Sequence, residues 1–107
     1  MKKISVKHVD KATMKIKASG EIDSTKSVRE MESIINETMT DIANECDDGV
    51  IFNIVNTDDG CVCLLKLKHR HGKDPEIKNP NQKIDKIKQK FIDNGYQDTD
   101  KESPDED

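Results

Sequence analysis

Two cysteines and two histidines lie close together in the chain, as Cys61-x-Cys63 and His69-x-His71. Thiolate and imidazole are the usual ligands of zinc, so the residue types alone would suit a metal centre. If all four side chains belong to one strand, however, a rise of ~3.3 Å per residue places Cys61 and His71 roughly 33 Å apart. One metal ion cannot bridge that distance. We therefore expect no metal and no cofactor, and we interpret the cysteines as small apolar side chains of the core.

Other enzyme signatures are missing from the sequence. It contains no Gly-rich phosphate loop, no Gly-x-Ser-x-Gly elbow and no His-Glu-x-x-His pair. No general base stands at a spacing that would make a nucleophile of Cys46 or another cysteine. We therefore predict that the protein is not an enzyme. Three cysteines without framework spacing suit a reducing compartment, and no run of about 18 apolar residues is present, so we expect a cytoplasmic protein outside the membrane.

Residues 50–71 predict a β-hairpin. β-branched and aromatic residues are dense in 50–55, as strands prefer, and a turn cluster follows at 56–60. Gly60 is expected to take the positive φ that closes the loop. Placing the apolar residues of both strands on one side then selects a single register. Its opposed pairs are Asn56–Cys61, Ile54–Cys63, Phe52–Leu65 and Val50–Leu67.

The residues before this hairpin predict two more strands and a helix. Apolar and polar residues alternate over 4–9 and again over 12–18. Between residues 28 and 46 apolar side chains recur at spacings of three and four, which is typical of an amphipathic helix. Residues 23–27, DSTKS, supply several N-cap candidates for its start, and Ser27 with Glu30 fits a capping box.

A second helix is predicted after the hairpin. Asn79 precedes a proline, which suits an N-cap followed by the first helical residue, and Asn94-Gly95-Tyr96 suits the stop. Residues 97–107 contain no apolar side chain and are rich in acidic ones, so we expect a disordered acidic tail. The single folded domain would then span residues 1–96.

The predicted order is strand–strand–helix, twice over. This is an α+β fold of ββαββα topology, with a four-stranded, mostly antiparallel sheet and both helices on one face. On the opposite face the pattern gathers basic side chains together with Asn53. The predicted binding residues on this basic sheet face are Lys7, Lys15, Lys17, Lys66, Lys68 and Arg70.

A second charged surface is predicted on the first helix. Spacings of seven, four and seven align carboxylates on the side away from its apolar stripe. Such a row can imitate a phosphate backbone, although a solvated helix face has the same appearance. The residues of this acidic alternative are Glu30, Glu37, Asp41 and Asp48.

Two functions are compatible with these surfaces. The first is a small non-enzymatic interaction protein that binds a protein of nucleic-acid machinery. In size and charge, though in no motif, the chain resembles small phage and mobile-element inhibitors of such machinery, anti-CRISPR proteins among them. The alternative is a module that binds duplex DNA or structured RNA directly through the basic sheet face. An exposed edge strand could also mediate a homodimer, which the outward-facing Val62 and Leu64 favour.

Overall fold

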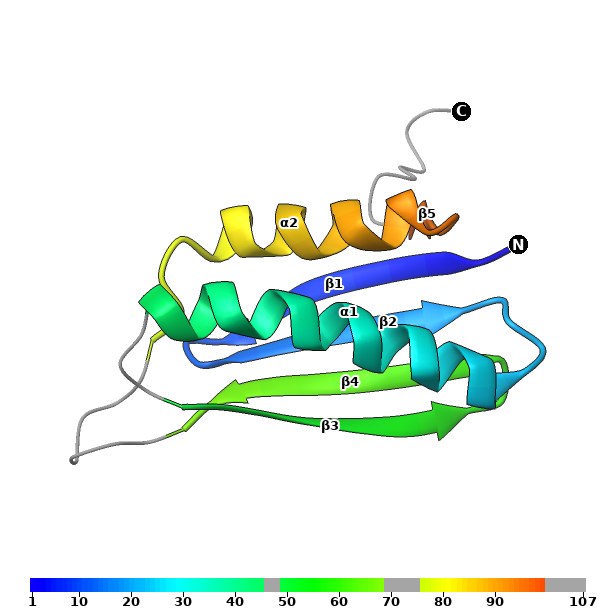
Figure 1. Ribbon diagram of the computed structural model, residues 1–107, viewed down its shortest axis with the longest axis horizontal. Coiled ribbons are helices and arrows are strands. Elements are labelled where there is room, and N and C mark those ends of the chain that lie inside the picture. Colours follow the sequence, from blue (N-terminus) through cyan, green and yellow to red (C-terminus); the bar gives the residue numbers. More distant parts are fainter. Residues whose placement is uncertain (46–48, 69–75, 100–107) are drawn as a thin grey trace.

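The computed structural model describes residues 1–45, 49–68 and 76–99, with residues 39–45 described by their backbone alone. Two hairpins, each followed by a helix, account for most of this part of the chain (Figure 1). The elements are β1 (Lys3–Asp10), β2 (Thr13–Ser19), α1 (Ser24–Glu45), β3 (Val50–Thr57), β4 (Gly60–Leu67), α2 (Pro80–Asp93) and β5 (Gln97–Asp98). The predicted α+β class and ββαββα order are confirmed.

The sheet has five strands in the order β3-β4-β2-β1-β5. β2 and β4 pair antiparallel and join the two hairpins, while β5 runs parallel to β1. The prediction of four strands was therefore short by one, and the sheet is mixed.

The extra strand lies at the start of the predicted tail, so the expected boundary at residue 97 was too early. Polar contacts hold this short strand, which explains why an apolar pattern did not reveal it. The Asp98 carboxylate lies 3.5 Å from Lys88 Nζ, and the Thr99 hydroxyl donates to the carbonyl of Ile4 at 3.1 Å. The rest of the predicted tail, residues 100–107, lies outside the described residues.

The register of the β3–β4 hairpin is the one predicted from its apolar pattern. All four expected pairs are present, and the ladder continues to Thr57–Gly60. Gly60, however, does not have the predicted positive φ. Its role is to permit close approach, because a Cβ at this position would lie 2.0 Å from the carbonyl oxygen of Ala18 on β2.

The start of α1 differs from the predicted capping box. The Asp23 carboxylate accepts hydrogen bonds from the backbone N–H groups of Thr25 at 3.0 Å and Lys26 at 3.2 Å, so Asp23 is the cap. Ser27 lies inside the helix and is buried. Asp23 is one of the predicted N-cap candidates, whereas the capping box at Ser27 and Glu30 was wrong. Several capping residues stand in succession, and spacing alone could not choose among them.

The ends of α2 are close to those predicted. Pro80 is its first residue, but Asn79 adopts a left-handed conformation without a side-chain cap bond. At the other end Gly95 has a φ of 95°, and the N–H of Tyr96 donates to the carbonyl of Phe91 at 3.1 Å. The two rings meet edge to face with centroids 5.2 Å apart, the apolar contact expected at such a stop.

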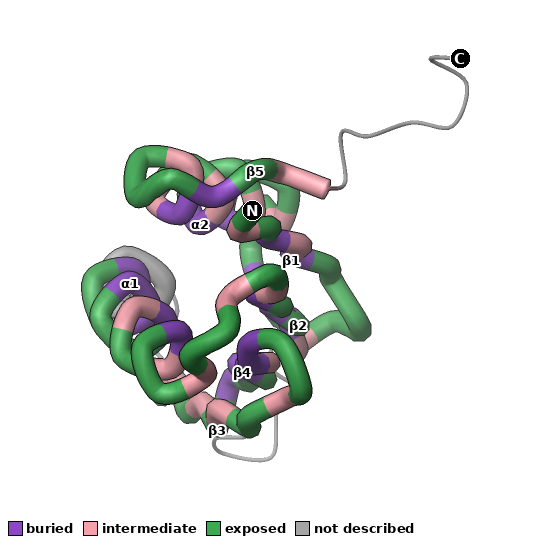
Figure 2. The backbone as a smooth tube through the Cα atoms, turned by 90° about the vertical axis from the view of Figure 1, so that its right-hand side faces the viewer, coloured by how far each residue is buried: buried purple, intermediate pink, exposed green. Residues whose placement is uncertain are grey.

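Both helices cover the same face of the sheet, and the core lies between the two layers (Figures 1 and 2). Successive side chains of a strand point to opposite faces of the sheet. Each strand therefore has one set of side chains on the helix side and one set on the outward side. On the helix side, Ile4, Ile16, Cys63 and Leu65 are fully buried. Neither α1 nor α2 lies over the outward side of the sheet. We call this side the open face.

Candidate interaction surface

The basic residues predicted on the sheet lie on the open face wherever the structure describes them. Lys7 comes from β1, Lys15 and Lys17 from β2, and Lys66 from β4, and all four are exposed. Lys68 follows the end of β4, where its N–H donates to the carbonyl of Gly49. Arg70 lies outside the described residues. In the sheet order β4-β2-β1 these three strands are neighbours. Their lysines are separated in the sequence but lie together on the open face.

The register places two of these lysines directly opposite each other. Lys7 pairs with Lys15 across β1 and β2, and Lys17 lies two residues along the same face of β2. Like charges directly opposite each other destabilise a sheet. The arrangement therefore costs folding stability and keeps a positive potential on the middle of the open face.

Lys3 also belongs to this surface, although the sequence analysis did not include it. It is exposed and two alternations before Lys7 on β1, opposite Ser19. The period-two pattern of the strand carried the necessary signal, but the predicted strand began one residue too late.

Apolar side chains occupy the other half of the open face. Leu64 lies opposite Lys15, and Val62 lies opposite Lys17. β3 adds Ile51 and Val55, which pair with Lys66 and Val62. Ile51, Val55 and Leu64 remain 49%, 54% and 47% exposed. Of these apolar residues, only the two on β4 were predicted to face outward. The two on β3 follow from the same hairpin register.

One carboxylate lies at the end of the open face. Asp10 lies opposite Thr13 after an irregularity in β1. The backbone N–H of Ala12 donates to it at 2.9 Å, and this bond, with Thr13 and then Lys66 adding to it, lowers the pKa of the carboxyl. Asp10 is therefore ionised at neutral pH and offsets charge at the Lys66 end of the face. Lys7, Lys15 and Lys17 lie further along the strands.

The two described members of the predicted acidic row on α1 do not share one exposed surface. Glu30 turns toward the N-terminal strand, where its carboxylate lies 3.3 Å from Lys2 Nζ and is largely covered. Glu37 is more exposed and lies 3.8 Å from Lys90 Nζ on α2. Asp41 belongs to α1 but its side chain is not described, and Asp48 lies outside the described residues. Helix spacing separates the buried side of α1 from its exposed side. It does not show that part of the exposed side faces α2.

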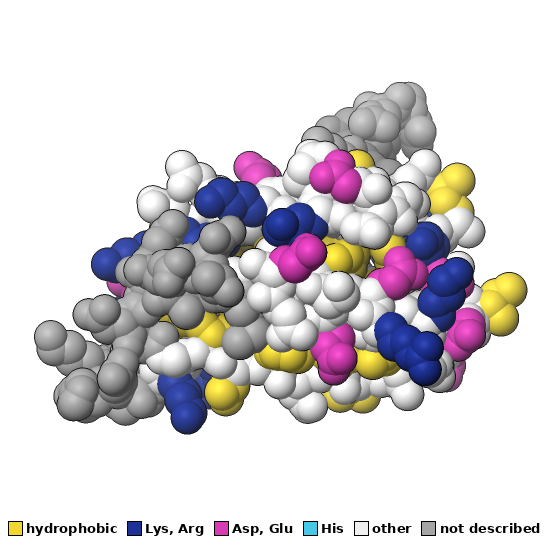
Figure 3. All heavy atoms as spheres, viewed as in Figure 1, with side chains coloured by type: hydrophobic (Ala, Val, Ile, Leu, Met, Phe, Trp, Pro, Cys, Tyr) yellow, Lys and Arg dark blue, Asp and Glu magenta, His cyan; other side chains and the backbone are white. Residues whose placement is uncertain are grey.

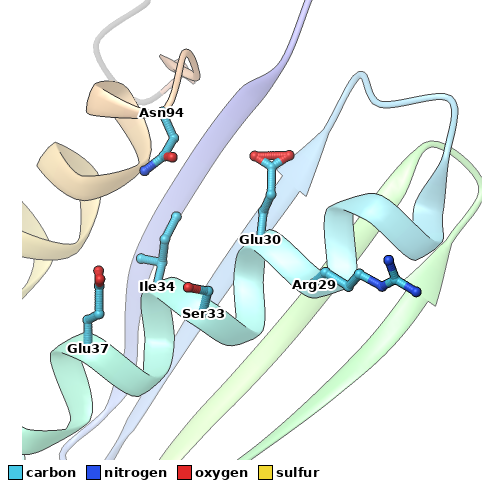
Figure 4. Close-up of a pocket in the computed structure, with 6 residues that line it drawn as sticks. All are labelled: Arg29, Glu30, Ser33, Ile34, Glu37 and Asn94. Atoms are coloured by element: carbon cyan, nitrogen blue, oxygen red, sulfur yellow. The ribbon is translucent and has the colours of Figure 1, made fainter.

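A pocket of about 270 Å³ lies between α1 and the end of α2. Glu30, Ile34 and Glu37 rise from α1 on one side, and Asn94 stands on the other (Figure 4). Lys2 already serves this region, because its ammonium group contacts Glu30, the carbonyl of Asn94 at 3.3 Å and the ring of Tyr96 at 4.7 Å. These contacts join β1, α1 and the end of α2, so the cluster has a structural role.

The described part of the helix-bearing side carries charges of both signs. Figure 3 shows basic and acidic side chains interspersed over the two helices. The ion pairs between Lys2 and Glu30 and between Lys90 and Glu37 belong to this side. On the described open face lysines predominate, with the Asp10 carboxylate at the Lys66 end.

The two described cysteines are fully buried, as predicted. Burial raises the pKa of the Cys61 thiol to about 11 and that of Cys63 to about 12. Both are therefore protonated thiols at neutral pH, a form that is a poor nucleophile. His69 and His71 lie outside the described residues, and the part of the chain that is described contains no cluster of three metal-ligating side chains.

Comparisons of the chain with models of protein families, with curated proteins and with solved structures find no match. The assignment of the candidate surface therefore depends on its geometry and chemistry. Across residues 1–45, 49–68 and 76–99, no helix has the length and apolar character needed to cross a membrane.

Proposed function

We propose that the protein is a non-enzymatic interaction protein whose open face binds an acidic surface on a partner protein. The observation that carries this proposal is the contact between the two halves of the face. Lys15 lies beside Leu64, and Lys17 lies beside Val62. Protein interfaces combine an apolar centre with a polar rim in this way. An acidic patch with apolar residues at its centre would complement the face.

The aromatic residues of the chain favour a protein partner over a single strand of nucleic acid. Proteins that bind single strands on a sheet stack bases on exposed aromatic side chains. The chain has two Phe, one Tyr and no Trp. Phe91 and Tyr96 are buried, and Phe52 points to the helix side opposite Leu65. A nucleic acid on the open face would have its phosphates near the lysines and its bases without a stacking platform.

The finer form of the proposal is that the partner belongs to nucleic-acid machinery and is inhibited by the bound protein. Its support is the small size of the chain, its high content of charged residues and the described open face. This form predicts that the purified protein lowers the activity of the captured partner in a nuclease or binding assay. A partner whose activity is unchanged would restrict the proposal to docking.

Capture with matched variants tests the docking surface. The bait proteins are the wild type, Lys15→Glu/Lys17→Glu, Leu64→Lys and the control Lys86→Glu, which makes the same type of charge change on an exposed site of α2. We expect a partner that the wild type and Lys86→Glu retain and that both open-face variants lose. The captured protein is then purified and its affinity measured by titration. Equal affinity for Leu64→Lys and wild type would contradict the proposal.

Direct binding to nucleic acid is the competing outcome. Labelled duplex DNA, single-stranded DNA and structured RNA are titrated with the protein across a salt series. The proposal predicts weak binding that disappears near physiological salt. Tight binding with a steep log–log dependence on salt, abolished in Lys15→Glu/Lys17→Glu and kept in Leu64→Lys, would assign the face to phosphates instead.

A further inference from the structure

The exposed edge of the sheet points to a second interaction that is independent of the proposed function. Among the described strands, β3 is the outermost on one side and pairs with β4 alone. Its eight residues pair without interruption, so no bulge turns it away from solvent. The opposite edge differs, because β1 is partly covered there by β5.

β3 also lacks the side chains that guard an edge strand. Charged residues, especially lysine, and proline normally keep such edges from pairing with another chain. The strand, VIFNIVNT, contains none of these. The other strands of the open face carry lysines, among them Lys15 on β2 and Lys66 on β4. The free edge is thus the uncharged strand of the face.

Burial on the helix side is incomplete at this edge. On β4, Cys63 and Leu65 are 0% exposed. Their partners on β3, Ile54 and Phe52, face the same core but remain only partly buried. A strand added beside β3 would cover the apolar surface that these two side chains still expose.

The sequence of β3 is complementary to itself in one antiparallel register. We propose that two copies of the chain pair through β3, with Asn53 of each copy opposite Asn53 of the other. In a continuous sheet, two residues that face each other across the seam must point to the same side. The register can therefore shift only by steps that keep open-face residues opposite open-face residues. Centred on Asn53, Ile51 meets Val55 on the open face and Phe52 meets Ile54 on the helix side. Moving the centre to Ile54 would place Phe52 opposite Asn56 and Ile51 opposite Thr57.

The lysines of the open face do not oppose this pairing. Lys66 of one copy and Lys17 of the second would be separated by Ile51, Val55 and Val62 in a row across the seam. At ~4.8 Å per strand they stand roughly 19 Å apart. This exceeds the Debye length of about 8 Å at physiological ionic strength, so solvent screens the repulsion. The dimer would have a ten-stranded sheet with an apolar centre and lysines on both flanks of the open face.

Sedimentation velocity from micromolar to sub-millimolar concentrations tests the inference with the full chain. We expect a reversible dimer for the wild type. Asn53→Asp places two carboxylates opposite each other at the seam and should raise the dimer dissociation constant about tenfold or more, whereas the neutral Asn53→Ser should not. Asn53 is exposed, so both monomers keep their fold, which circular dichroism verifies. A wild type that stays monomeric throughout, or a dimer unaffected by Asn53→Asp, overturns the inference.

Two further variants separate edge pairing from stacking of open faces and fix the register. Leu64→Lys leaves the free edge of β3 unchanged, although Leu64 on β4 lies opposite Asn53. The two introduced lysines would stand about 14 Å apart across the seam, beyond the Debye length, so the dimer should persist. Its loss would mean face-to-face stacking and would overturn the inference. In a Cys46→Ser background, Asn53→Cys should form an intermolecular disulfide with mild thiol oxidant, whereas Thr57→Cys and the background alone should not. Equal cross-linking of Asn53→Cys and Thr57→Cys would contradict the register. Leu64→Lys also loses the partner in the capture experiment, so the two proposals can fail separately.

Discussion

A glycine is required at position 60, as predicted, but the predicted reason for it is wrong. A turn cluster before Cys61 predicts a glycine that uses positive φ, but the structure uses the missing Cβ. The carbonyl of Ala18 belongs to a strand far away in the sequence, and strand order cannot be inferred from local pattern. This is a general limit: turn chemistry is local, whereas a close approach depends on tertiary neighbours.

Alanine substitutions at two glycines test this explanation. Gly60→Ala should lower the free energy of unfolding by about 2 to 3 kcal/mol, because backbone must move away from the added Cβ. Gly49→Ala is the matched control: its Cβ would meet the flexible Lys68 side chain at 3.3 Å. That change should stay within about 1 kcal/mol. Urea denaturation of both variants gives the values, and equal losses would contradict the close-approach argument.

The buried thiols predict a loss of stability in alkali. The pKa values of Cys61 and Cys63 are raised from 9.0 to about 11 and about 12 in the folded chain. The native state therefore holds these protons more tightly than the unfolded state, so their contribution is complete below pH 9 and is lost as pH rises toward 12. The free energy of unfolding, measured from pH 8 to 11, should fall. Burial also raises the pKa of the Tyr96 hydroxyl, so the comparison is with Cys61→Ala/Cys63→Ala, whose decline should be shallower. An identical slope would contradict the assignment.

At the scale of elements, periodic apolar patterns were sufficient where each element has one buried side. The β3–β4 register and the stop of α2 at Gly95 follow from local sequence. β5 did not, because two polar residues held by Lys88 and the backbone of β1 have no apolar period. The side of α1 that faces α2 was also misassigned, since helix spacing separates core from solvent but does not reveal a neighbouring helix.

Two truncations test the contribution of β5. Ending the chain after Tyr96 removes the pairing with β1, the Asp98–Lys88 ion pair and the Thr99 hydrogen bond. This should lower the free energy of unfolding by about 1 to 3 kcal/mol. Ending it after Thr99 should change stability by less than about 0.5 kcal/mol. Thermal and urea unfolding measure both, and equal stabilities would show that β5 contributes nothing.

The opposed lysines of β1 and β2 give another prediction at this scale. Replacing Lys15 by Gln removes its repulsion from Lys7 and should raise the free energy of unfolding by about 0.2 to 0.5 kcal/mol at low salt. The gain should shrink as salt is added. Lys86→Gln on α2 serves as control. A loss of stability in Lys15→Gln at low salt would contradict the repulsive reading of this pair.

For the whole molecule, the arrangement of the layers determines which surfaces are available. Both helices cover one face and carry charges of mixed sign (Figures 2 and 3). The sheet leaves its other face open, with lysines next to apolar residues. Sequence pattern identified most of the lysines, but not that β2 and β4 are neighbours. This pairing places Lys15 beside Leu64 and creates the mixed surface on which the proposed function depends.

Lysine footprinting of the complex with the captured partner tests the central claim most directly. An amine-reactive label modifies exposed lysines, and mass spectrometry compares their modification in the free and bound protein. The open-face lysines Lys7, Lys15, Lys17 and Lys66 should be protected by the partner, whereas Lys26 on α1 and Lys86 on α2, also exposed, should react as before. Protection of Lys26 and Lys86 with unchanged labelling of the open face would contradict the claim, because the partner would then bind the helices.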